Sequence, residues 1–110
     1  MTYDYWLNVT DQSGQTHRIP AIEGWTVMEM IRDAGLPIKA ECGGACSCAT
    51  CHIYIEQPWH KYLHAPREDE IERLDQAFLV EAERSRLACQ IVFKPILDGL
   101  TLTLAPGTEL

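Results

Sequence analysis

One run of ten residues, positions 42–51, constrains this chain more than any other segment. It holds four cysteines, and every other side chain in it is no larger than threonine. A fifth cysteine, Cys89, lies far downstream. Small residues let backbone N–H groups approach whatever the thiolates surround. Thiolates gathered around something small suit an inorganic cluster better than an apolar core, so we expect a [2Fe-2S] centre.

The spacing of the cysteines separates this hypothesis from its alternatives. The pattern is Cys42-x5-Cys48-x2-Cys51, and Cys89 supplies a fourth distant thiolate. A structural zinc site usually brings two close pairs, whereas only Cys48 and Cys51 form such a pair here. A thioredoxin-type redox pair would leave three cysteines unexplained. A Rieske centre needs two histidine ligands, and only His52 adjoins the run. The cluster therefore explains the pattern best.

Composition and charge narrow the class of protein. The 110 residues fit a single domain over positions 1–110, and 46% of them are hydrophobic, enough for one compact core. An odd number of cysteines argues against a disulfide framework and for a reducing, cytoplasmic compartment. No apolar run approaches the ~18 residues that span a membrane, and no secretory signal is visible. The net charge of −7 disfavours nucleic acid and anionic membranes and favours basic protein partners.

Hydrophobic periodicity predicts an α+β fold of four or five strands and two helices. The predicted strands cover residues 3–9, 16–20, 52–55, 87–93 and 100–104. A capping box, Thr26-x-x-Glu29, predicts a first helix that ends at Gly35. Pro66 is expected to open a second helix, whose buried stripe would be Ile71, Leu74 and Phe78.

Residues 67–75 hold five acids among nine residues. Acidic side chains near the start of a helix are usually a solvated face that the helix dipole favours. An electron carrier could use the same face to attract its partners, because long-range attraction raises the encounter rate without making the complex slow to dissociate.

Two motifs together resemble a known family. Cys42-x5-Cys48-x2-Cys51 is followed directly by His52, and Ser85-Arg86-Leu87-Ala88-Cys89-Gln90-Ile91 follows later. The combination resembles the [2Fe-2S] ferredoxins of the adrenodoxin and putidaredoxin type over nearly the whole chain. The plant-type spacing C-x4-C-x2-C does not fit. The resemblance implies a β-grasp fold, a mixed sheet with a core helix, and an added helix that carries the acids.

The resemblance also implies roles for particular residues. The cluster ligands would be Cys42, Cys48, Cys51 and Cys89. Cys46 would then be spare, either as a small thiol that fills the loop, or as a helper in cluster acquisition or a substitute ligand when a neighbouring cysteine is lost. The docking residues would be Asp69, Glu70, Glu72 and Asp75, with Glu68 as a fifth.

Two further residues have expected roles, and the resemblance implies the first of these. His52 would link the cluster loop to the rest of the fold by hydrogen bonds. An exposed strand residue or a metal ligand are the alternatives for this histidine. Arg86 would be structural.

The expected function is one-electron transfer without substrate chemistry. The sequence has no nucleophile–base pair, phosphate loop or dinucleotide fingerprint, so an enzyme is not expected. The resemblance implies a bacterial, monomeric carrier that takes electrons from an NAD(P)H-dependent flavoprotein ferredoxin reductase. A haem-thiolate (cytochrome P-450) monooxygenase is the expected acceptor. Iron-sulfur cluster biosynthesis is the alternative acceptor, and a non-redox zinc or structural-cluster module is the alternative from another class.

Overall fold

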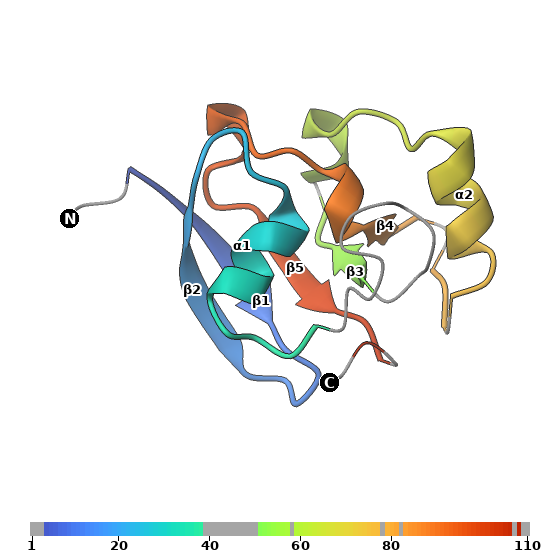
Figure 1. Cartoon of the computed structure of the whole chain (residues 1–110), viewed down its shortest axis with the longest axis horizontal. Coiled ribbons are helices and arrows are strands. Elements are labelled where there is room, and N and C mark those ends of the chain that lie inside the picture. The colour runs from blue at the N-terminus through green and yellow to red at the C-terminus, as the bar shows by residue number, and fades with distance from the viewer. Residues whose placement is uncertain are drawn as a thin grey trace.

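Five strands form one mixed sheet in the order β2-β1-β5-β3-β4 (Figure 1). The computed structural model describes residues 4–38, 51–57, 59–77, 79–81, 83–106 and 108. β1 pairs with β5 in parallel, and every other neighbouring pair is antiparallel. The strands are β1 Tyr5–Thr10, β2 Thr16–Ala21, β3 His52–Ile55, β4 Ser85–Leu87 and β5 Thr101–Leu104. The number of strands is thus the upper value that the sequence predicts.

The β1–β2 hairpin shows why the first strands form. Leu7 and Val9 alternate with half-buried residues and are fully buried, and Leu7 lies opposite Ile19. The turn is organised by Asp11. Hydrogen bonds from the Ser13 side chain, and next from His17, hold the pKa of the Asp11 carboxyl well below its usual range.

Helix α1, Val27–Asp33, lies across the sheet and fills the core. Its predicted capping box is confirmed, because the Thr26 hydroxyl accepts from the Glu29 N–H while the Glu29 carboxylate accepts from the Thr26 N–H. Ile31 is fully buried against the sheet. Gly35 follows the helix with a φ of 79°, a value that suits glycine and ends the helix where the sequence predicts.

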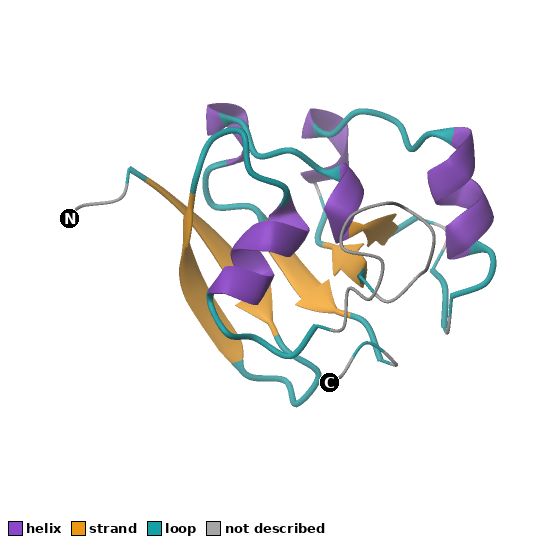
Figure 2. Cartoon of the chain, in the orientation of Figure 1, coloured by secondary structure: helices purple, strands orange, loops and turns teal. Residues whose placement is uncertain are grey.

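The added segment lies between β3 and β4 and carries a short 3-10 helix, η1 Trp59–Tyr62, and helix α2, Glu68–Leu74. Figure 2 shows that α2 lies beyond the edge of the sheet at which β4 is the last strand. Two more 3-10 helices, η2 Ala88–Gln90 and η3 Pro95–Leu97, follow β4. The predicted α+β, β-grasp type of fold with an added helix is confirmed. In the described ranges no helix is long and apolar enough to cross a membrane.

Three details of the predicted elements are wrong. The strand predicted over 87–93 ends at Leu87, because the chain turns into η2, and Val92 keeps only an isolated bridge to Thr26. Pro66 does not open α2, since Arg67 is its N-cap and Glu68 its first residue. The third detail, the buried face of α2, bears on the site and is described there. Residue 3 of the first strand and Phe78 of the predicted buried stripe lie outside the described residues.

Candidate metal centre

Two cysteines that are far apart in the sequence meet at one end of the β3–β4 pair. Cys51 directly precedes β3, and Cys89 lies in η2 directly after β4. His52 lies opposite Leu87 in the antiparallel ladder, and the Ala88 N–H donates to the Cys51 carbonyl at 3.0 Å. This pairing brings the two Sγ atoms to 3.3 Å from each other. That separation is far longer than a disulfide bond of about 2.05 Å.

The surroundings of these sulfurs fit an iron–sulfur group. Cys51 is completely buried and Cys89 is 5% exposed. The Gln90 side-chain amide donates to the Cys89 Sγ at 3.4 Å, as a donor to a charged thiolate would. Cysteine thiolates are soft ligands of the kind that iron–sulfur clusters use, and here two of them are buried next to each other. Within the described residues no third histidine, cysteine or carboxylate joins them.

The remaining predicted ligands are Cys42 and Cys48, and they lie outside the described residues together with Cys46. The complete ligand set therefore stays a prediction. The part that the structure describes shows half of the predicted set, Cys51 and Cys89, side by side.

His52, the first residue of β3, connects β3 to β4 through its side chain. Its ring is 1% exposed, and its Nε2 faces the Ser85 Oγ at 2.7 Å across the β3–β4 pair. The Ser85 Oγ also accepts from the Glu81 N–H at 2.8 Å, and the Tyr54 ring stands edge-on to the histidine at 5.0 Å. This is a contact between His52 and β4; the cluster loop, the other end of the predicted link, lies outside the described residues.

Arg86 is structural, as predicted, and its partner is Glu70. The guanidinium donates from Nε and Nη2 to the two Glu70 carboxylate oxygens at 2.7 and 3.1 Å, and from Nη1 to the His64 carbonyl at 2.9 Å. The Leu87 N–H also donates to Glu70, at 2.9 Å. Glu70 is fully buried. The prediction that Glu70 belongs to an exposed docking face is therefore wrong, because its carboxylate is turned inward to neutralise Arg86.

The same interaction sets the rotation of α2. Glu70 and Leu74 form its buried face, whereas Ile71, predicted to be buried, is 47% exposed. The acids on the other faces are exposed, namely Glu68, Asp69, Glu72 and Asp75. Periodicity alone missed Glu70 because it treats every acid as a surface residue. The signal that could have identified it is Arg86, a cation directly before the apolar Leu87-Ala88 pair.

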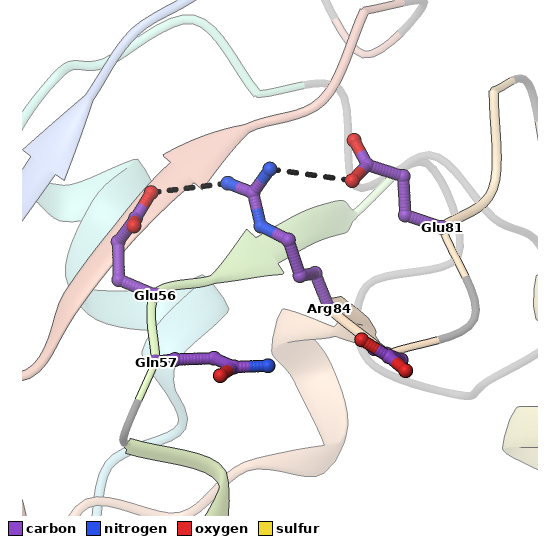
Figure 3. A pocket seen from close by; sticks show the side chains of 5 residues that line it. Glu56, Gln57, Glu81 and Arg84 are labelled. Carbon is purple, nitrogen blue, oxygen red and sulfur yellow. Dashed lines mark hydrogen bonds and ion pairs between the residues drawn. The ribbon is translucent and has the colours of Figure 1, made fainter.

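A hollow of about 630 Å³ lies between the end of β3 and the segment before β4 (Figure 3), and the side chains in it serve to hold these two segments together. Arg84 reaches between two carboxylates in it, Glu56 at 3.0 Å and Glu81 at 3.3 Å. Gln57 and Glu83 complete its lining. Its cation is already paired, and the Arg84 guanidinium also lies over the Tyr54 ring at 5.2 Å. These contacts join the end of β3 to the segment before β4.

The family model of the 2Fe-2S iron-sulfur cluster binding domain matches residues 10–94, which include all five cysteines. The chain belongs to the [2Fe-2S] ferredoxins. Rhodocoxin from Rhodococcus erythropolis is 41% identical to this ferredoxin over 92 residues, which cover 83% of this chain and 86% of rhodocoxin. The ferredoxin CarAc from a Sphingomonas species is 45% identical over 92 residues, 83% of this chain and 84% of the relative.

Solved structures place the ferredoxin within the adrenodoxin and putidaredoxin type. A chain in the crystal structure of the covalent putidaredoxin reductase–putidaredoxin complex matches with a TM-score of 0.85 and 30% identity. The match covers 90% of this chain and 96% of that one. The ferredoxin is an electron carrier with one [2Fe-2S] cluster, and it is not an enzyme. The zinc module and the thioredoxin-type pair are thereby set aside.

Proposed function

We propose that this ferredoxin carries single electrons from an NAD(P)H-dependent flavoprotein ferredoxin reductase to a haem-thiolate (cytochrome P-450) monooxygenase in the bacterial cytoplasm. The observation that carries the proposal is the pair of buried sulfurs, Cys51 and Cys89, 3.3 Å apart beside an acidic helix. The covalent complex of putidaredoxin with its reductase supports a flavoprotein donor, because this chain is 30% identical to a chain of that complex.

The proposed ligands are Cys42, Cys48, Cys51 and Cys89. The cluster, when bound, supplies reversible one-electron chemistry. Each iron of such a cluster takes two protein ligands, and adjacent sulfurs bind the same iron. Cys51 and Cys89 would therefore share one iron, and Cys42 and Cys48 the other. Cys46 stays outside the set.

The proposed docking face is the exposed side of α2, with Asp69, Glu72 and Asp75 and with Glu68 beside them. The same face also carries an exposed apolar side chain, Ile71, which the sequence did not predict. It shares a shallow hollow with Glu68, Asp69 and Glu72. Acids provide long-range attraction to a basic partner, and one exposed isoleucine gives a small contact that releases easily. Both properties suit a carrier that must leave each partner quickly.

The ligand set is tested by replacing one cysteine at a time. Cys42→Ser, Cys48→Ser, Cys51→Ser and Cys89→Ser should each lose most of the iron and the visible absorbance of the cluster, because serine oxygen is a harder ligand than thiolate. Cys46→Ser is the matched control and should keep two irons and two labile sulfides. A Cys46→Ser protein that lost its iron while one of the other variants kept it would contradict the assignment.

The acceptor is tested by direct comparison of electron flow. The reduced ferredoxin would be mixed with cytochrome P-450 enzymes of the source organism and, separately, with its cysteine desulfurase–scaffold complex. Fast reduction of a P-450 haem supports the proposal. Fast turnover only with the assembly complex would make cluster biosynthesis the function instead.

A further inference from the structure

A groove of about 410 Å³ opens beside Cys89, and its charge is opposite to that of the molecule as a whole. The chain carries a net charge of −7, yet the described residues that line this groove include no acid. They are His64, Arg67, Cys89, Gln90, Val92 and Lys94.

The two formal cations of the groove are available to a partner. Arg67 is the N-cap of α2 and Lys94 is the N-cap of η3, and both side chains are exposed. Among the described residues, neither has a carboxylate within 4.0 Å, whereas Arg84 and Arg86 are both used in ion pairs. Charge that is not neutralised within the protein can act on a group that approaches from outside.

The wall of the groove is held in place by His64. Its Nδ1 lies 2.9 Å from the Ala65 carbonyl oxygen and its Nε2 lies 3.0 Å from the Gln90 carbonyl oxygen. The backbone of His64 is tied as well, since its carbonyl accepts from Arg86. The groove is thus attached to the same segment that positions Cys89, and its cations keep a defined relation to that cysteine.

The groove lies beside Cys89, one of the predicted cluster ligands. Cys89 is one of the residues that line this groove, whereas Cys51 is completely buried and does not line it. Val92, 44% exposed, adds an apolar contact at the same place. We propose that the groove receives an acidic side chain of a redox partner protein, which docks over Cys89. This inference rests on the proposed function, because it takes Cys89 as a cluster ligand.

Small oxidants of opposite charge test the groove in the holo-protein. One electron leaves the reduced cluster and converts anionic ferric EDTA to ferrous EDTA, or cationic hexaamminecobalt(III) to cobalt(II). At low ionic strength, Arg67→Gln and Lys94→Gln should each slow oxidation by ferric EDTA by about threefold and speed oxidation by the cobalt complex. The control Arg18→Gln removes the same charge from β2, at the opposite edge of the sheet from β4 (Figure 1), and should change neither rate.

A peptide then distinguishes a protein carboxylate from a free anion. Acetylated hexaglutamate should slow the ferric EDTA reaction of the wild type, and not that of Lys94→Gln, at concentrations where inorganic phosphate of equal ionic strength has no effect. Equal inhibition by phosphate would overturn the proposal in favour of a small-anion site. Unchanged rates in both groove variants, with the visible spectrum of an intact cluster, would overturn this inference alone. A wild-type protein without a cluster would overturn the proposed function as well.

Discussion

At the scale of single residues, the structure adds neighbours that spacing cannot reveal. The cysteine pattern predicted that Cys51 and Cys89 belong to one set of four thiolates, and in the structure the sulfurs of these two are 3.3 Å apart. It could not predict the amide of Gln90 at 3.4 Å from the Cys89 sulfur, because a side chain next to a ligand can point in any direction. Hydrogen bonds to sulfur raise the reduction potential of a cluster, since they stabilise the more negative, reduced state.

Gln90→Leu should therefore lower the midpoint potential of the ferredoxin. A lost hydrogen bond worth about 1 kcal/mol corresponds to about 40 mV for one electron. A spectroelectrochemical titration of the holo-protein measures the change. Gln57→Leu is the control, because this exposed glutamine lines the Arg84 hollow and should leave the potential unaltered. A potential that stayed the same or rose in Gln90→Leu would show that the amide does not stabilise the reduced cluster.

At the scale of elements, periodicity predicted where α2 lies but not which way it faces. The prediction placed Ile71 in the core and Glu70 on the surface, whereas in the structure Ile71 is exposed and Glu70 is buried. The reason is a long-range interaction: Arg86 on β4 draws the Glu70 carboxylate inward, and a pattern read within one helix does not contain its partner. β4 is also shorter than predicted, because the turn of η2, which carries Cys89, replaces the rest of the predicted strand. Local signals, such as the Thr26 capping box, were predicted correctly.

Glu70→Gln should destabilise the protein by about 3–5 kcal/mol, because it leaves the guanidinium of Arg86 buried without a counter-charge. Urea unfolding of the holo-protein, followed by far-ultraviolet circular dichroism, measures the loss. Glu72→Gln makes the same chemical change two residues away on the exposed face and should cost less than about 0.5 kcal/mol. Equal losses in the two variants would mean that the buried pair contributes little.

At the scale of the whole molecule, charge is distributed unevenly. Arg67 lines the basic groove beside Cys89, and the exposed acids of α2 follow it directly in the chain. The acidic face was predicted from the run of five acids in residues 67–75 and from the resemblance to the family. The sequence could not predict the groove, because His64, Arg67 and Lys94 are up to 30 residues apart and meet only in the folded chain.

Neutralising the acidic face should slow the reduction of the ferredoxin by its flavoprotein reductase. We expect Glu72→Gln with Asp75→Asn to reduce the second-order rate about tenfold at low ionic strength, and much less at 0.5 M salt, since salt screens exposed charges. Stopped-flow absorbance gives the rates. Glu23→Gln with Asp33→Asn removes the same charge from two exposed residues outside α2 and serves as the control. Identical rates for both double variants at low salt would argue against docking on α2.

The place of β5 in the sheet has a consequence for biogenesis. It joins the β1–β2 hairpin to the β3–β4 pair, and within the described sheet no other strand connects the two. Residues 101–104 are translated after the other four strands, so a ribosome-bound chain holds two separate pieces of sheet until they emerge. Stable insertion of iron and sulfide is thus expected only after residues 101–104 have emerged from the ribosome.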